Sequence, residues 1–162
     1  MNKRILLLAA VSILIASMAV GTVNACITLT PGYWKNHPNA WLADSLEIGG
    51  DMYTKSELLV ILRTPVRGDA WVNLMQKVIA AKLSMIADPQ PLLGTDPPYM
   101  HWDDADLFGG VSFSSQVVLA NEWLVSHTSP VKSGDAGYAQ GIAYASWIDY
   151  WLNYWDEGGP SA

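Results

Sequence analysis

Residues 70–87 read AWVNLMQKVIAAKLSMIA and form the strongest helical pattern of the chain. Asp69 precedes this stretch as a candidate N-cap, and Asp88-Pro89 ends it because the residue before a proline avoids helical backbone angles. The positions within it are nearly all apolar, apart from a narrow polar stripe formed by Asn73, Gln76, Lys77 and Ser84. A helix with so narrow a polar stripe is covered on most sides in a folded protein. The pattern therefore predicts a central helix in a mainly α fold.

The segment before this helix predicts a shorter helix and a small hairpin. Thr54-Lys55-Ser56-Glu57 is a capping box, in which each outer side chain accepts a hydrogen bond from the backbone amide of the other. The helix that it starts extends to about Arg63, because Pro65 stops it. Residues 47–53 alternate polar and apolar side chains around Gly49-Gly50, which allows a β-hairpin at this point.

Two further helices are predicted in the second half of the chain. Ser114 or Ser115 caps a helix that runs to about Ser126, and Asp135 caps a final helix over residues 136–155. Together with the two earlier helices, they predict a compact bundle of about four helices. An N-terminal aromatic loop is expected to lie across this bundle.

The final helix concentrates the aromatic residues in two neighbouring stripes. The first consists of Tyr138, Ile142, Ala145, Ile148, Leu152 and Trp155. The second consists of Tyr144, Trp147, Trp151 and Tyr154. A helix that is apolar over so wide an arc is either sandwiched between other elements or exposes an aromatic strip. We expect packing against Tyr33, Trp34 and Trp41, and the second stripe is the candidate binding strip if it is exposed.

The first residues predict export. Residues 1–25 combine a short basic start, an apolar run over 5–20 and small residues before a cut after Ala25, as a secretory signal peptide does. The run is near the lower limit for spanning a bilayer, so a retained anchor is the alternative. Residues 26–162 then form a single secreted or cell-surface domain. Cys26, the only cysteine, is lipidated, paired with another chain or free, and a lipid there is the expected route to a membrane.

The charged and aromatic residues of the chain indicate which kinds of partner to expect. Fifteen Asp and Glu residues stand against nine Lys and Arg, which gives a net charge of −6 at pH 7. This excess of acids argues against nucleic acid as a partner. Eight Trp and seven Tyr stand against two Phe. Because Trp and Tyr rings carry a polar group, they suit interfaces and sugar-binding faces as well as cores.

The sequence lacks the common signatures of catalysis and cofactor binding: GxSxG, HExxH, Cys-x-x-Cys, the P-loop and the dinucleotide glycine pattern. The remaining candidate is the acidic loop 101–106, with His101, Asp103, Asp104 and Asp106. Its oxygens suit Ca²⁺, but a loop read from Asp104 lacks two of the required ligands, so a solvated acidic loop is favoured. A glycosidase would also need two carboxylates that face each other. We therefore expect no cofactor, with Ca²⁺ at this loop as the weaker alternative.

Residues 26–41, CITLTPGYWKNHPNAW, carry a specific motif. This segment resembles a family of small exported proteins from bacteria and archaea that share a Cys-Thr-x-Thr-x-Gly-Tyr-Trp-Lys-Asn-His-Pro start. Residues 32–38 match without a gap, and the likeness continues through residues 48–50, 53–58 and 64–69 to 80–83. The resemblance covers about the first half of the exported chain. It implies export and a shared fold more than a biochemical activity.

The motif supports two interpretations of its central residues, which are Tyr33, Trp34, Lys35, Asn36 and His37. They are either an internal staple that covers the central helix or a binding site that stacks on a sugar and hydrogen-bonds its hydroxyls. The leading function hypothesis is a non-enzymatic surface or matrix protein that acts through contacts with other surface proteins. The alternatives are a glycan-binding module that uses exposed Trp and Tyr rings, and a hydrolase that uses loop 101–106.

Overall fold

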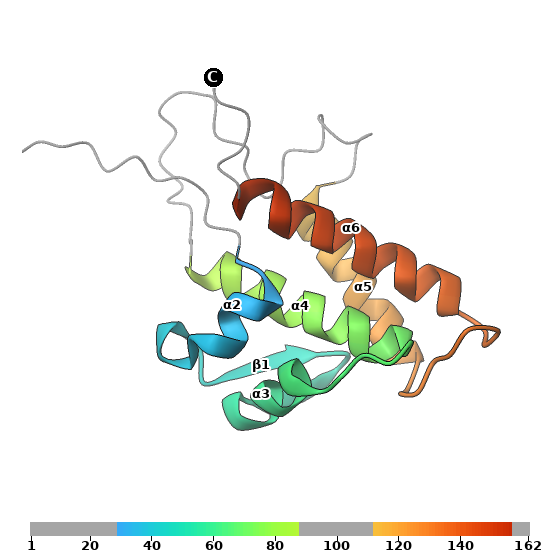
Figure 1. Ribbon diagram of the computed structural model, residues 1–162, viewed down its shortest axis with the longest axis horizontal. Coiled ribbons are helices and arrows are strands. Elements are labelled where there is room, and N and C mark those ends of the chain that lie inside the picture. The colour runs from blue at the N-terminus through green and yellow to red at the C-terminus, as the bar shows by residue number, and fades with distance from the viewer. Residues whose placement is uncertain (1–28, 88–111, 157–162) are drawn as a thin grey trace, which may run out of the picture.

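The computed structural model describes residues 29–87 and 112–156, and these parts are mainly helical with one small antiparallel hairpin (Figure 1). The predicted fold class is confirmed. The elements are α2 (Pro31–Asn36), η1 (Pro38–Ala40), β1 (Ser45–Ile48), β2 (Asp51–Thr54), α3 (Lys55–Arg63), α4 (Ala70–Ala87), α5 (Phe113–Ser126) and α6 (Tyr138–Asp156).

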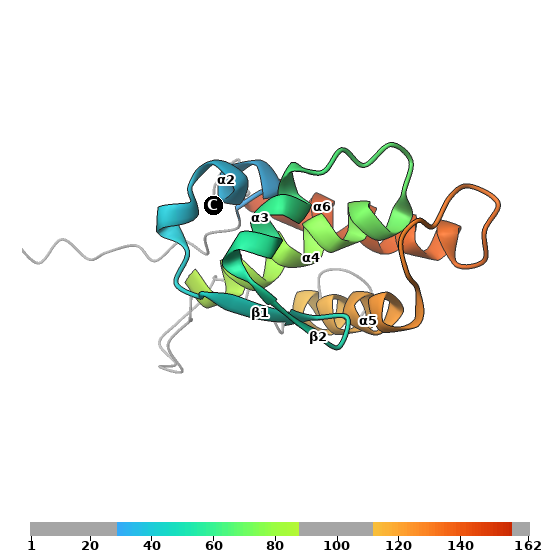
Figure 2. The ribbon, with the colours of Figure 1, turned by 90° about the horizontal axis from the view of Figure 1, so that it is seen from below.

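Helix α4 is the predicted central helix, and its bounds agree with the sequence pattern. It packs against α2, α3, α5, α6 and β1, so that most of its surface is covered (Figures 1 and 2). Its buried side chains include Leu74, Met75, Val78, Ile79 and Leu83. Ser84 departs from the predicted polar stripe, because it is completely buried. Its hydroxyl accepts from the Leu29 amide and the Trp34 indole, which satisfies a polar group that the core would otherwise penalise.

The predicted caps of α3 and α4 are both present. The Thr54 hydroxyl accepts from the Glu57 amide, and the Glu57 carboxylate accepts from the Thr54 amide at 2.7 Å. The Asp69 carboxylate caps α4 by accepting from the Trp71 amide at 3.0 Å. It also accepts from the Val131 amide at 3.0 Å, so the same side chain ties the start of α4 to the segment between α5 and α6.

The hairpin packs its tip against α5. Gly49 and Gly50 both have positive φ, which allows the tight two-residue turn between β1 and β2. The Gly49 amide donates to the Asn121 side chain at 2.9 Å. A Cβ at Gly49 would lie 3.2 Å from Leu124 Cβ, so the close approach of the turn also favours glycine.

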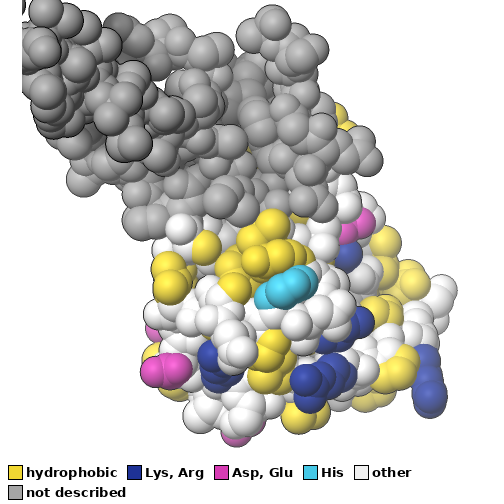
Figure 3. Space-filling view, turned by 60° about the vertical axis from the view of Figure 1, so that its left-hand side comes forward, with side chains coloured by type: hydrophobic (Ala, Val, Ile, Leu, Met, Phe, Trp, Pro, Cys, Tyr) yellow, Lys and Arg dark blue, Asp and Glu magenta, His cyan; other side chains and the backbone are white. Residues whose placement is uncertain are grey.

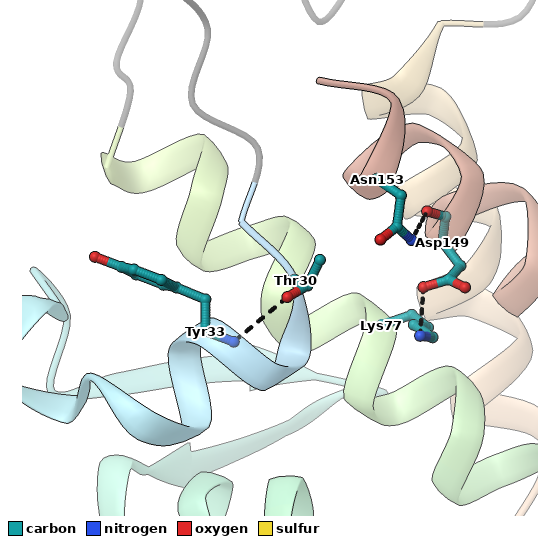
Figure 4. A network of polar contacts seen from close by, with 5 residues as sticks. All are labelled: Thr30, Tyr33, Lys77, Asp149 and Asn153. Carbon is teal, nitrogen blue, oxygen red and sulfur yellow. Dashed lines mark hydrogen bonds and ion pairs between the residues drawn. The ribbon is translucent and has the colours of Figure 1, made fainter. Parts of the chain in front are cut away.

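Helices α4 and α6 are joined by a polar link on their shared side (Figure 4). Lys77 of α4 forms an ion pair with Asp149 of α6, whose backbone carbonyl accepts from the Asn153 amide at 2.7 Å. Asp149 and Asn153 thus form a short polar row on α6. The neighbouring apolar stripe is buried, as predicted, at Ala145, Ile148 and Leu152.

The predicted N-terminal aromatic segment contains two short helices, α2 and η1, within residues 31–40. Thr30 caps α2 by accepting from the Tyr33 amide (Figure 4), and Pro31 follows at the first helical position, where its missing amide costs nothing. Pro38 then starts η1 directly after α2.

The predicted starts of the last two helices are also corrected. Helix α5 is capped by Ser112, whose hydroxyl accepts from the Ser115 amide at 3.1 Å, and not by Ser114 or Ser115. Helix α6 starts at Tyr138, because Gly137 before it has a positive φ of 82°. The Asp135 carboxylate accepts from the Lys132 amide instead of capping the helix.

Candidate functional site

The motif segment contains a structural staple at Trp34. This side chain is 1% exposed, and its indole donates to the buried Ser84 hydroxyl of α4 at 3.2 Å. The carbonyl of Trp34 accepts from the Trp41 indole at 2.9 Å. Trp34 thus fastens α2 to the central helix, and its ring is not available to a ligand.

The other motif side chains lie on the outer side of α2. Tyr33 and Lys35 are half-buried, whereas Asn36 and His37 are exposed. The His37 ring stacks on Tyr33 with 4.2 Å between centroids, and its Nδ1 lies 2.9 Å from the Tyr33 carbonyl. A carbonyl oxygen only accepts, so Nδ1 is the donor and the ring closes the C-terminal end of α2. The five motif residues therefore do not converge on a single ligand site.

The aromatic strip of α6 packs mainly on α5. Trp151 is 2% exposed, and Trp147 is half-buried. Their rings lie 5.5 and 6.1 Å from the Phe113 ring, measured between centroids. Phe113 of α5 is thus a packing partner of this strip that the sequence did not predict. Tyr144 is half-buried, and the side chain of Tyr154 lies outside the described residues.

The outer side of α5 exposes aliphatic side chains, and we call Val118, Leu119, Glu122 and Val125 the contact face. Val118 is 57%, Leu119 40% and Val125 60% exposed. The inner side of the same helix buries Phe113, Val117, Ala120 and Leu124 against the rest of the bundle. Helix α5 is therefore apolar on both sides, although only one side is covered by the described fold.

A polar pocket of about 220 Å³ lies beside the contact face, between α5 and α6. It is lined by Leu119, Glu122, Trp123, Ser126, His127, Gln140 and Tyr144. The Gln140 amide donates to the Tyr144 hydroxyl at 3.2 Å. The Glu122 side chain is exposed, and its carboxylate has no hydrogen-bond or ion-pair partner among the described residues. The pocket thus offers a carboxylate, an amide and a phenol to a small polar group.

One wall of this pocket is a stacked pair of rings held against two glycines. Trp123 and His127 stack with 4.1 Å between centroids. A Cβ at Gly137 would lie 2.2 Å from His127 Nε2, and a Cβ at Gly141 would lie 2.7 Å from the Trp123 ring. Since real Cβ atoms do not approach so closely, both positions require glycine for this packing.

Ser126 and His127 do not form a nucleophile and base. His127 Nδ1 lies 2.9 Å from the Trp123 carbonyl, which only accepts, so this nitrogen carries the proton. The Ser126 hydroxyl donates to the same carbonyl at 2.9 Å. A protonated Nδ1 cannot take the serine proton, which is what nucleophilic catalysis would need. Both side chains instead close the C-terminal end of α5.

A second groove of about 360 Å³ lies between the hairpin and the end of α4. It is lined by Ser45, Leu46, Glu47, Met52, Lys82, Met85 and Ile86. Burial lowers the pKa of Lys82, an effect that the charge of Glu47 opposes. The Lys82 ammonium donates to the Glu47 carbonyl at 2.6 Å, on a strand that pairs with β2 alone within residues 29–87 and 112–156. A lysine in this position blocks unwanted strand pairing.

Several predicted site residues lie outside the described residues: Cys26 and the loop residues His101, Asp103, Asp104 and Asp106. Within residues 29–87 and 112–156, no cluster of three or more His, Cys, Asp or Glu side chains is placed to hold a metal ion. In the same residues, no helix is both long and apolar enough to cross a membrane.

Sequence reasoning missed Glu122, Gln140 and His127 as pocket residues. The usable signals were the i, i+4 spacing of Trp123 with His127 and the Gly137-x-x-x-Gly141 spacing on the next helix. Comparison of the chain with family models, curated proteins and solved structures gave no match.

Proposed function

We propose that the chain is an exported, non-enzymatic protein of the cell surface or extracellular matrix that binds a protein partner through the contact face of α5. The observation that carries the proposal is the exposure of Val118, Leu119 and Val125 on one side of a single helix. Single exposed aliphatic residues are common, but neighbouring ones on a regular surface are typical of interaction sites. Covering them by a partner removes apolar area from water, which favours binding by roughly 25 cal/mol per Å².

The polar groups beside the contact face support a binding role over a catalytic one. Ser126 and His127 are engaged with the Trp123 carbonyl at the end of α5. Glu122 lies between the exposed aliphatic side chains and provides a charge that selects the partner's orientation. The sequence of residues 1–25 supports export, and a lipid on Cys26 would hold the domain at a membrane surface.

Site-specific photo-crosslinking in the exporting cell tests this proposal. A photoreactive side chain at position 118 or 125 should give defined cross-links to protein, whereas the same group at Ser133 should give none. Ser133 is the matched control because it is exposed in the segment between α5 and α6. Absence of defined cross-links from both 118 and 125 would contradict the proposed function.

Glycan binding is the second candidate function, and the pocket between α5 and α6 favours it. The half-buried Tyr144 ring lies there with the Glu122 carboxylate and the Gln140 amide around a volume of about 220 Å³. These groups suit stacking on a sugar ring and hydrogen bonding to its hydroxyls. Calorimetric titration with monosaccharides should show binding that Tyr144→Ala removes and Tyr150→Ala, on the exposed side of α6, retains. Equal binding by the two variants would contradict this candidate.

A further inference from the structure

Basic residues are distributed unevenly over the described surface. The sequences of α5 and α6 contain neither Lys nor Arg. Apart from Lys132, the Lys and Arg residues of the described parts precede α5, and they are Lys35, Lys55, Arg63, Arg67, Lys77 and Lys82. Figure 3 shows Lys and Arg side chains gathered in the lower part of the face on the α2 side. The contact face of α5 therefore has acidic and apolar character without a nearby cation from its own helix.

The acidic character of the contact face comes from one side chain of α5. Glu122 lies on α5 between the aliphatic side chains, and its carboxylate has no partner among the described residues. The hairpin tip lies close to this face, because a Cβ at Gly50 would lie 3.7 Å from Val125 Cγ2. A partner for this face should thus present an apolar side chain next to a cation.

The outer side of α3 presents an apolar side chain next to a cation. It also carries Glu57, whose carboxylate accepts from the Thr54 amide and hydroxyl. Val60 is 64% exposed, and Arg63 lies one helical turn further along the same exposed side. The Arg63 guanidinium makes no hydrogen bond or ion pair with the described residues, unlike Lys77, which is paired with Asp149. Figure 2 shows that α3 follows one end of the hairpin, whereas α5 lies beside the hairpin turn. The two surfaces are thus separate on one molecule, which leaves each open to another copy.

We infer that the partner of the contact face is a second copy of this chain, which docks the outer side of its α3 onto α5. This inference rests on the proposed function and names the partner of the same face. Val60 of one copy fits between Val118 and Val125 of the next, which are two helical turns apart, and Arg63 faces Glu122. A symmetric pairing of two α5 faces would instead bring Glu122 against Glu122 without a compensating Lys or Arg from α5 or α6.

Because the two surfaces in this contact are different, each bound copy still offers one free surface. Such head-to-tail contacts continue into filaments or close into rings. Assembly of this kind would suit a protein that covers a cell surface or builds a matrix, as proposed above.

Sedimentation of two complementary variants tests the inference. Val60→Asp disables the α3 surface but keeps α5 intact, whereas Val118→Arg disables the contact face but keeps α3 intact. Both side chains are mostly exposed, so the melting temperatures should stay unchanged. The exported chain should form species larger than dimers as its concentration rises, each variant alone should remain monomeric, and the equimolar mixture should stop at dimers. Leu42→Asp is the matched control: Leu42 is 71% exposed outside both surfaces, and this variant should assemble like the parent.

Three results would overturn the inference: a parent chain that stays monomeric, a Val60→Asp variant that assembles like the parent, or a mixture that stays monomeric. A different measurement, the cross-linking from the contact face, decides whether the proposed function fails. Cross-links from position 118 to a different protein, together with a monomeric parent chain, would retain the contact face and refute self-assembly. Absence of cross-links from positions 118 and 125 would refute both.

Discussion

Within the segment from Tyr33 to His37, burial separates the side chain that builds the fold from those that face solvent. Trp34 is enclosed by α2, α3 and α4, and its only polar atom donates to Ser84. His37 and Asn36 lie outside on the same short helix. A sequence motif can therefore be distinctive for a structural reason, because one of its residues packs in the core.

Replacing Trp34 by Ala should lower the free energy of unfolding by about 3–5 kcal/mol, because it leaves a cavity beside α4 and removes a partner of the Ser84 hydroxyl. The neighbouring Asn36→Ala change, at an exposed position, should cost under about 0.5 kcal/mol. Urea denaturation of both variants measures the difference. Equal stability of the two would show that Trp34 is not the staple of this segment.

Asp69 makes stability depend on pH. Burial raises the pKa of this carboxyl, but hydrogen bonds from the Ser129 hydroxyl and the Val131 and Trp71 amides outweigh that effect and leave the pKa lowered. The resulting stabilisation is complete above the unfolded pKa of about 3.9 and is lost as the pH falls through the lower folded value.

Asp69→Asn should therefore cost about 1–3 kcal/mol at pH 7, since an amide cannot reproduce all of these charge-assisted bonds. The difference from the parent chain should shrink as the pH falls below about 3.9, because the unfolded chain binds a proton there before the folded carboxyl does. Denaturation curves of both proteins at pH 7 and pH 3 measure this difference in the free energy of unfolding. A difference that stays constant between these two pH values would contradict the assigned role of the charge.

At the scale of elements, local signals predicted the helices with strong caps. The capping box at Thr54 and the cap at Asp69 involve residues within three positions of each other, so their hydrogen bonds could be read from sequence. The contact face could not be predicted in this way. Helix α5 has apolar residues on both its inner and its outer side, and the positions of α4, α6 and the hairpin determine which side stays open.

The pocket beside the contact face could not be predicted from the sequence either. Its residues come from two helices, and what brings Glu122 and Gln140 together is the close approach of α5 and α6 over Gly137 and Gly141. The start of α6 was misplaced for a related reason, because Asp135 has a local alternative partner in the Lys132 amide. Such competition between partners is decided by the whole fold.

Thr54→Ala should destabilise the domain by roughly 1 kcal/mol, the usual cost of losing an N-cap side chain. The exposed hydroxyl of Ser133, between α5 and α6, provides the control, and Ser133→Ala should stay within about 0.5 kcal/mol of the parent. Thermal unfolding distinguishes the two. An unchanged melting temperature for Thr54→Ala would indicate that the cap contributes nothing to α3.

Gly141→Ala should destabilise the protein by about 1–3 kcal/mol, although alanine is the better helix former. The new methyl group would meet the Trp123 ring, which is buried between α5 and α6. In a Trp123→Leu background the same change should cost much less, since the obstructing ring is gone. A double-mutant cycle by urea denaturation measures this coupling, and additive effects would contradict the packing described here.

At the scale of the whole molecule, the bundle has two kinds of apolar surface. One is buried around α4 and holds the motif residue Trp34 in place. The other lies on the outer side of α5, where aliphatic residues surround an unpaired Glu122. The buried surface around α4 stabilises the fold, and the exposed surface of α5 is the one that we propose binds a partner.

Thiol labelling tests directly whether the contact face is covered where the protein works. Val118→Cys and Ser133→Cys each add one exposed thiol, and the parent chain gives the background from Cys26. We predict that a maleimide reacts with the cysteine at position 118 much more slowly on intact exporting cells than in dilute purified protein, while position 133 reacts equally fast in both. Equal rates at position 118 in the two settings would show that the contact face is open to solvent and would contradict the account.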